Sequence, residues 1–178
     1  SEDVPLFERH NDKTIAIVVV DDDDRWRAPV LARLLQIELP DLAVTCSMGF
    51  DAVESAPVPD HLVATSAKLT VDLSSHRSQR LHVKSIMESD YVLVFDQASR
   101  DKVAVATQRT ERVLPASLFL PPQYESVLAG VAIKRGSAIP SVGVDVQLLK
   151  EQGQVLALVT SGFAEFLRYE HRGTFTKA

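Results

Sequence analysis

The sequence has a single cysteine, Cys46, among its 178 residues. One cysteine excludes an internal disulfide, and scarce cysteine is typical of proteins in a reducing compartment, so we expect a cytoplasmic protein. No apolar run approaches the roughly 18 residues that a membrane span needs, and nothing at the start reads as a signal peptide. Because the sequence begins at Ser1, it is either a trimmed chain or a piece of a longer protein.

Excess positive charge is also lacking. The formal net charge is −5, which argues against a general affinity for nucleic acid or for an acidic membrane. The remaining composition is that of an ordinary globular protein, with 46% hydrophobic and 24% charged residues. The length suits one domain with a sizeable core. We expect this domain at residues 14–172, between a flexible N-terminal arm at 1–13 and a C-terminal tail at 173–178.

Short apolar runs alternate with helical patterns along the chain. Short runs that are apolar on both faces are typical of buried parallel strands, and they occur at residues 15–20, 43–46, 91–95 and 112–114. Helices are expected after Arg27 as far as Ile37 and at residues 59–70, 82–88, 98–107 and 146–170. Residues 115–145 show no clear period. Alternation of strands and helices predicts an α/β three-layer sandwich, in which a central parallel four-stranded sheet carries helices on both faces.

The loop after the first strand concentrates charge. Four adjacent aspartates, Asp21 to Asp24, are followed by Arg25, Trp26 and Arg27. In parallel α/β folds, ligands bind at the carboxyl ends of strands, where a loop leads into a helix. A charge run is more often a solvated turn, and aspartate at the start of a helix is stabilising in its own right.

This loop resembles the phosphate loop of the low-molecular-weight protein tyrosine phosphatases. Their pattern is an apolar strand, then V-C-x-G-N-x-C-R-S-P, then a helix. Val20 matches the valine, Arg27 the invariant arginine and Pro29 the proline.

Three later segments are similar to the same family in the same order. Residues 47–50 resemble its S-A-G-T turn, residues 72–81 its D-L-S-x-H-x-x-x-x-L stretch, and residues 89–96 its A-D-L-V-L-V-M-D strand. The resemblance runs from about residue 14 to 114 and implies the phosphotyrosine phosphatase I-like fold, to which the last helix also belongs.

The resemblance implies a chemistry that needs no cofactor. A cysteine thiolate attacks phosphorus, backbone amides and the arginine hold the phosphate, and an aspartic acid in a D-P pair protonates the leaving oxygen. The match to the D-P pair here is Ser141-Val142, with Asp145 nearby as a substitute acid. The loop departs from the family at five positions: Asp21 replaces the nucleophilic cysteine, Asp23 the glycine, Asp24 the asparagine, Trp26 the second cysteine and Ala28 the serine.

These departures predict a degenerate, catalytically inactive phosphatase fold, or pseudophosphatase, with a binding or regulatory role. We expect Arg27, at the phosphate-binding position, to pair with Asp21 or Asp23 in the space of the phosphate, and we take Asp22 and Asp24 as the candidates for unpaired carboxylates. Bacterial relatives act with tyrosine kinases of polysaccharide export. The resemblance therefore implies a partner in a tyrosine-phosphorylation or polysaccharide-export system.

Two other functions fit the aspartates. An apolar strand that ends in Asp-x-Asp resembles the first motif of haloacid-dehalogenase-type phosphatases, with Asp21 as nucleophile, Asp23 as acid and Mg²⁺ as cofactor. Against this, the sequence shows no convincing later lysine and acidic motif. A purely structural or cation-binding domain is the third possibility.

Three residues outside the aspartates have simpler interpretations. We expect His76 to be a hydrogen-bonded structural residue and Cys46 to be a small core residue within a strand. Trp26 is expected to be exposed at the tip of the loop, as a packing residue or a partner contact.

Overall fold

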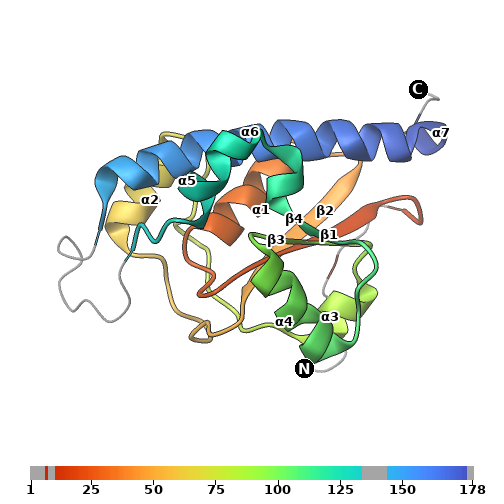
Figure 1. Ribbon diagram of the computed structural model, residues 1–178, viewed down its shortest axis with the longest axis horizontal. Helices are drawn as coiled ribbons and strands as arrows, with labels where there is room; N and C mark the ends of the chain where they lie inside the picture. The colour runs from red at the N-terminus through yellow and green to blue at the C-terminus, as the bar shows by residue number, and fades with distance from the viewer. Residues whose placement is uncertain (1–6, 8–10, 134–143, 176–178) are drawn as a thin grey trace.

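A computed structural model gives the structure of the chain and describes residue 7 and residues 11–133 and 144–175. It is a three-layer α/β sandwich (Figure 1). The strands are β1 (Ile15–Asp21), β2 (Ala43–Gly49), β3 (Tyr91–Val94) and β4 (Val113–Pro115). They form one parallel sheet in the order β2-β1-β3-β4, so the predicted central four-stranded parallel sheet is confirmed.

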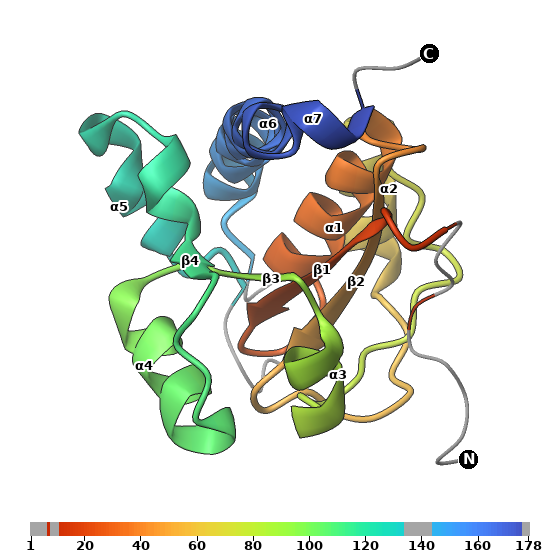
Figure 2. The same cartoon turned by 90° about the vertical axis from the view of Figure 1, so that its right-hand side faces the viewer.

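Helices cover both faces of this sheet (Figure 2). One face carries α1 (Arg27–Glu38), α2 (Asp60–Ala67), α5 (Glu125–Ala129) and the long α6 (Val146–Glu170), and the other carries α3 (Val83–Glu88) and α4 (Gln97–Thr107). Two 3₁₀ helices, η1 (Ala116–Phe119) and η2 (Pro122–Tyr124), precede α5, and α7 (Arg172–Phe175) follows α6.

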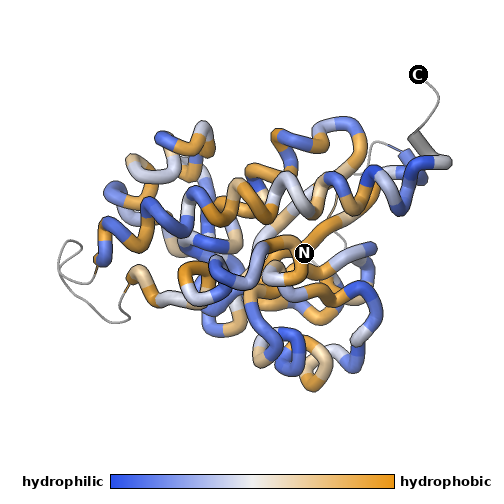
Figure 3. Tube along the Cα trace, turned by 45° about the horizontal axis from the view of Figure 1, so that its top comes forward, coloured by the Kyte–Doolittle hydropathy of each residue, from blue (hydrophilic) through white to orange (hydrophobic). Residues whose placement is uncertain are grey.

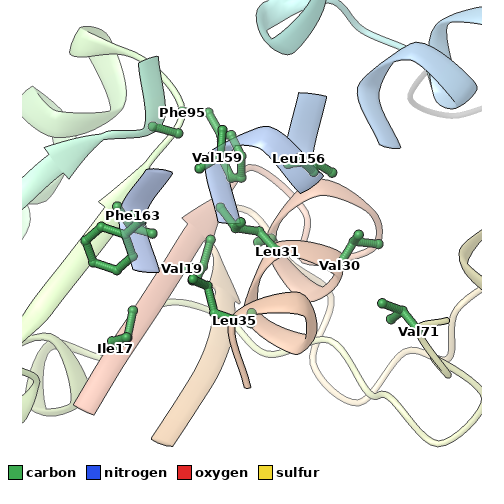
Figure 4. Close-up of a cluster of buried hydrophobic side chains, with 14 of the residues drawn as sticks. Ile17, Val19, Val30, Leu31, Leu35, Val71, Phe95, Leu156, Val159 and Phe163 are labelled. Carbon is green, nitrogen blue, oxygen red and sulfur yellow. The ribbon is translucent and has the colours of Figure 1, made fainter. Parts of the chain in front are cut away.

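Alternate residues of β1 supply two separate cores. Ile15, Ile17 and Val19 face the larger core beneath α1 and α6, while Val18 and Val20 face the smaller core beneath α3 and α4. Because side chains alternate across a strand, a run that is apolar on both faces must be covered on both sides. Figure 4 shows the larger core.

The long helix α6 lies across the upper face and alternates apolar and polar residues along its length (Figures 1 and 3). Its Leu156, Val159 and Phe163 are fully buried over β1 and α1. This helix is amphipathic because its apolar residues recur at helical spacing, as predicted, and its bounds match those expected from the sequence.

The remaining predicted elements are found within a few residues, with two exceptions. The strand expected to end at Cys46 continues to Gly49, and the segment after residue 115, which showed no period, contains η1, η2 and α5. In the part of the chain that the structure describes, no helix is long and apolar enough to cross a membrane.

Candidate functional site

The aspartate loop lies where the sheet reverses its winding. The chain passes from β1 through α1 to β2 on one side, and it returns to β3 on the other side of β1. Loops at the carboxyl ends of two such strands diverge and leave a crevice, which is the usual ligand position in this class of fold. Residues 21–27 begin at that point and lead directly into α1.

Asp21, the last residue of β1, turns its carboxylate back into its own loop. Oδ1 accepts the backbone amide of Asp24 at 2.7 Å and Oδ2 accepts that of Ala28 at 2.8 Å. The side chain is 3% exposed. Burial, with the charge of Asp23 added, raises the pKa of Asp21 to about 7, although Arg27 and the two amides oppose the rise. Asp21 is therefore a buried carboxyl group whose two oxygens are taken up by amides of its own loop.

Asp24 is fully buried and adopts a left-handed backbone conformation, with φ of 55°. Asparagine and aspartate accept this conformation more readily than other residues that carry a side chain. Its Oδ2 accepts the amide of Gln79 at 2.9 Å and lies 3.4 Å from Nε2 of His76. The interpretation of Asp24 as an unpaired carboxylate was therefore wrong, because the position faces the inside of the loop.

The end of β2 and the residue that follows it fix one side of the loop. Gly49 ends β2 directly against it, so that a Cβ atom at this position would lie 2.8 Å from the amide nitrogen of Asp24 and 2.9 Å from the carbonyl oxygen of Asp22. The amide of Phe50 also donates to the carbonyl of Asp21 at 2.9 Å. The S-A-G-T-like segment thus holds the loop through backbone contacts that need a glycine.

Arg27 does not pair with the aspartates as expected. Its guanidinium donates to the carbonyl of Leu128 at 2.8 Å and lies over the ring of Phe95, 4.7 Å from the centroid. Among the described residues, no carboxylate lies within ion-pair distance of it. The expected pairing failed because Asp21 is already bound to amides, while α5 supplies a carbonyl close to Arg27. This carbonyl also accepts Nε2 of Gln152 at 3.5 Å.

The two middle aspartates are half-buried. Asp23 pairs with Arg25, at 3.0 Å between Oδ2 and the guanidinium. Within the described residues, the side chain of Asp22 has neither an ion pair nor a hydrogen bond, so Asp22 is the aspartate for which the unpaired interpretation holds.

Trp26 is buried rather than exposed. Its ring is 3% exposed in the larger core, and Nε1 donates to Oε1 of Gln152 at 3.2 Å. Gln152 lies on α6, is fully buried, and donates through Nε2 to the carbonyls of Val127 and Gly130 at 2.9 and 2.7 Å. Gln152 was not predicted as a site residue; its signal in the sequence is a glutamine on the inward face of an otherwise apolar helical stripe.

A cavity of about 470 Å³ opens beside the loop. Its walls come from the loop, α6 and the segment after α5, namely Asp21, Asp22, Asp23, Trp26, Arg27, Gln152 and residues 130–133. The loop thus contributes carboxylates and the guanidinium of Arg27 to the lining, while residues 130–133 contribute apolar surface. This is the position that the phosphate was expected to occupy.

Of the positions matched to the catalytic acid, the structure describes Asp145. Asp145 caps α6, because its exposed side chain accepts the amide of Leu148 at 3.0 Å. Ser141 and Val142 lie outside the described residues. Within the residues that the structure describes, no three histidine, cysteine, aspartate or glutamate side chains converge as a metal site would require.

The two simpler expectations were close to the structure. His76 is a hydrogen-bonded residue, as expected, with its partner in the aspartate loop. Cys46 lies on β2 and packs against the smaller core while remaining partly exposed. Burial raises the pKa of its thiol to about 12, helped by the charge of Asp24, so the group stays neutral.

Comparisons with known proteins agree with this geometry. No protein-family model matches the chain. A stretch of 91 residues, 51% of the chain, is 31% identical to the probable low molecular weight protein-tyrosine-phosphatase EpsP of Ralstonia nicotianae. The chain spans about 61% of the length of that curated relative.

Solved structures match over most of the chain. The tyrosine phosphatase AmsI of Erwinia amylovora superposes with a TM-score of 0.70 at 19% identity, covering 90% of this chain and 97% of that one. The YwlE arginine phosphatase of Geobacillus stearothermophilus gives a TM-score of 0.71 at 18% identity, with coverage of 89% and 96%. The chain has the fold of the low-molecular-weight protein tyrosine phosphatases.

Three segments that resemble the family in sequence meet at the loop. They are residues 21–27, the turn at Gly49, and the segment that carries His76 and Gln79. The carboxyl group of Asp21 lies inside this arrangement and accepts amides of its own loop.

Proposed function

We propose that this chain is a degenerate member of the low-molecular-weight protein tyrosine phosphatase family that does not hydrolyse phosphate esters and that acts by binding a partner. The observation that carries the proposal is the position of the Asp21 carboxylate. At the nucleophile position this residue accepts two backbone amides, from Asp24 and Ala28. In a phosphate loop, backbone amides are the groups that hold the substrate anion.

Electrostatics also disfavour a phosphate in this loop. Asp21, Asp22 and Asp23 all line the cavity, and two like charges 4 Å apart repel by about 4 kcal/mol at an effective dielectric of 20. The N-terminus of α1 offers only about half a positive charge. Arg27, the residue expected to clamp the phosphate, donates to the Leu128 carbonyl. Repulsion therefore outweighs the attraction that remains.

A catalytic acid is the second requirement that the described residues do not meet. In the family pattern, this acid precedes the last helix. Here Asp145 precedes α6, but its carboxylate is engaged as the helix cap. A group that protonates a leaving oxygen must reach that oxygen within hydrogen-bond distance, and a capping carboxylate has to leave its amide to do so.

The proposal is tested by turnover and by anion binding. Purified protein without added metal should not hydrolyse an aryl phosphate above the background rate, and the Asp21→Ala variant should give the same rate. Calorimetric titration with inorganic phosphate should show no saturable binding at millimolar phosphate. A clear hydrolysis rate that disappears in Asp21→Ala would overturn the proposal.

The partner and its compartment belong to the same proposal. The resemblance favours a cytoplasmic protein of a tyrosine-phosphorylation or polysaccharide-export system, and the relative EpsP is described as a probable low molecular weight protein-tyrosine-phosphatase. A direct test is calorimetric titration with the tyrosine-rich tail of a purified tyrosine kinase, in phosphorylated and unphosphorylated forms. Because the loop repels anions, the unphosphorylated tail should bind at least as tightly as the phosphorylated one.

The metal-dependent alternative requires Asp21 and Asp23 to hold Mg²⁺. Both oxygens of Asp21 accept amides and Asp23 pairs with Arg25, so binding a cation would require these contacts to break. A specific ligand at 100 times its dissociation constant stabilises a fold by about 2.7 kcal/mol. Under our proposal, millimolar Mg²⁺ gives no such shift in melting temperature. A shift that is lost in Asp23→Asn would favour the metal site.

A further inference from the structure

The aspartate loop is held against the segment at 76–79 by contacts between Asp24 and His76. Nε2 of His76 lies 2.9 Å from the backbone carbonyl of Asp24 and 3.4 Å from its Oδ2. The His76 side chain is 10% exposed and that of Asp24 is fully buried. The neighbouring amide of Gln79 donates to the same Oδ2 at 2.9 Å. Three contacts therefore join one loop residue to the segment at 76–79.

The geometry fixes which nitrogen of His76 titrates. A carbonyl oxygen can only accept, so Nε2 must carry a proton to bond the carbonyl of Asp24. The charge of the imidazole therefore depends on Nδ1. Whether or not Nδ1 is protonated, the Nε2 hydrogen bond persists, but the attraction to the Asp24 carboxylate exists only for the charged ring.

A positive charge on His76 stabilises the buried carboxylate of Asp24. Its Oδ1 is buried with no hydrogen-bond partner in the part of the chain that the structure describes. A buried carboxylate that is neither fully hydrogen-bonded nor paired is costly. The residue also sits at a φ of 55°, a conformation that persists only where the surroundings enforce it. Loss of the positive charge on His76 thus removes a main compensation for the buried carboxylate.

We propose that Asp24 and His76 form a pH-dependent clasp that holds the loop at 21–27 against the segment at 76–79 under mildly acidic conditions and loosens it under mildly alkaline conditions. This inference concerns the conformation of the loop and does not depend on whether the protein hydrolyses phosphate.

The charged and titratable groups around His76 agree with this assignment. Asp24 comes from the loop, and Arg33, on α1, opposes the positive charge of the ring. On its own segment, Arg77 donates to the backbone carbonyl of His76 at 2.9 Å. Burial alone would lower the pKa of His76, but the hydrogen bond and the charge of Asp24 outweigh burial and Arg33, so this pKa lies above its ordinary 6.5.

The direction of the effect follows from linkage. A histidine whose pKa is raised by folding contributes stability that is fully present below the unfolded pKa of 6.5 and is lost as pH rises through the folded pKa. Mild acidification therefore strengthens the clasp. This is opposite to the ordinary acid response of carboxylates that are ion-paired in the folded state.

Trp26, the sole tryptophan, reports on the loop directly because it lies within it and is buried. Its fluorescence emission should shift to longer wavelength between pH 6 and 9 as the loop loosens, with the midpoint at the pKa of His76 measured by NMR on the same sample. His76→Gln should abolish this transition. His82→Gln is the matched control, because His82 is half exposed and lies 3.9 Å from an exposed Glu54, and it should leave the transition unchanged.

Two further variants separate this clasp from the titration of Asp21. Asp21→Asn should keep the transition, because it leaves His76 and Asp24 in place. Asp24→Asn keeps an acceptor for Gln79 and tolerates the same φ, but it removes the charge. It should lower the pKa of His76, abolish the fluorescence transition, and melt above the wild type at pH 9, because no buried carboxylate remains without its counter-charge.

Each measurement either supports or overturns the clasp. A wild-type His76 pKa below 6.5 would overturn the clasp even if every variant failed to fold. So would a wild-type emission spectrum that does not change between pH 6 and 9, or a transition that survives in His76→Gln and disappears in Asp21→Asn. An elevated His76 pKa that falls in Asp24→Asn, with the fluorescence transition tracking it, establishes the clasp.

Discussion

Oδ2 of Asp21 accepts the backbone amide of Ala28 at 2.8 Å, which ties the end of β1 to the first turn of α1 through a buried carboxylate. Burial raises the pKa of this carboxylate to about 7 from the ordinary 3.8. Charging it at neutral pH therefore opposes folding, even though both oxygens accept amides.

The first prediction concerns the pH dependence of stability. A carboxylate with a raised folded pKa contributes stability that is lost as pH rises from the unfolded pKa to the folded one. For Asp21 this window runs from about 4 to about 7, and the loss is at most about 4 kcal/mol at 1.4 kcal/mol per pKa unit. Urea unfolding at pH 5, 6, 7 and 8 should show a steeper fall for the wild type than for Asp21→Asn.

The exposed Asp41→Asn serves as the matched control and should follow the wild-type profile. Parallel profiles for the wild type and Asp21→Asn would show that Asp21 titrates normally and that its burial does not matter.

The second prediction is that the nucleophile alone does not restore catalysis. Asp21→Cys should remain inactive towards an aryl phosphate, because Asp23 still occupies the glycine position and still lines the cavity. Adding Asp23→Gly, Asp24→Asn, Trp26→Cys and Ala28→Ser should restore phosphate binding, measured by calorimetry. The Trp26 change empties core volume and should cost about 3–5 kcal/mol of stability. Normal turnover by the single Asp21→Cys variant would contradict the charge argument.

The third prediction separates the two half-buried aspartates. Asp22 has no ion pair within the described residues, so Asp22→Asn should leave the melting temperature unchanged or raise stability by up to about 1 kcal/mol. Asp23→Asn removes the 3.0 Å pair with Arg25 and also relieves repulsion, so its net effect should be less favourable than that of Asp22→Asn. Thermal melts at neutral pH and low salt decide the order, and salt should reduce the difference. Equal losses of stability in Asp22→Asn and Asp23→Asn would mean that both carboxylates have partners in the folded protein.

The fourth prediction tests the support of the loop. Gly49→Ala places a Cβ atom 2.8 Å from a backbone nitrogen and 2.9 Å from a backbone oxygen of the loop, and backbone atoms cannot move aside as a flexible side chain can. We expect a loss of about 1–3 kcal/mol, as for overpacked sites, together with a shift in Trp26 emission. In Gly173→Ala the added Cβ atom meets nothing within 4 Å, so this variant should keep wild-type stability and wild-type Trp26 emission. Wild-type stability in the Gly49→Ala variant would mean that the loop is not held by β2.

The sheet was predictable because its strands carry a strong physical signal. Ile15 to Val20 is too short for a helix and apolar at every position, and such a run must be a strand buried on both faces. The long helix α6 was equally clear, because many apolar residues at helical spacing outweigh any single exception. One exception is Leu158, an apolar residue of this helix that is 44% exposed.

The interior of the loop could not be predicted in the same way. Local sequence places four aspartates in a turn, but it does not determine which carboxylate accepts a hydrogen bond from an amide, which contacts a histidine and which faces water. Asp24 meets His76 across 52 residues of chain, and Trp26 meets Gln152 across 126. Contacts of this kind depend on the packed fold. They explain why Arg27 and Trp26 were predicted wrongly while the position of the loop was predicted correctly.

The last prediction concerns Gln152, which joins the loop to the segment after α5. Its Oε1 accepts Nε1 of Trp26, and its Nε2 donates to the carbonyls of Val127 and Gly130. Gln152→Leu keeps a similar volume but leaves the Nε1 donor of Trp26 and the carbonyl of Gly130 without this partner, while the carbonyl of Val127 still accepts the amide of Gly130 at 3.3 Å. Because each unsatisfied buried group costs about 1–3 kcal/mol, we expect a loss of at least about 2 kcal/mol in urea unfolding.

Gln152→Glu provides the sharper comparison, because the carboxylate can still accept from Trp26 but cannot donate to either carbonyl. It should therefore be destabilising at neutral pH and partly recover in acid, where a protonated carboxyl again donates one hydrogen bond. Gln147→Leu is the matched control on the same helix, because Gln147 is exposed and its side chain bonds only Glu151 within the described residues. If Gln152→Leu and Gln147→Leu were equally stable, with unchanged Trp26 emission, Gln152 would not connect the loop to α5.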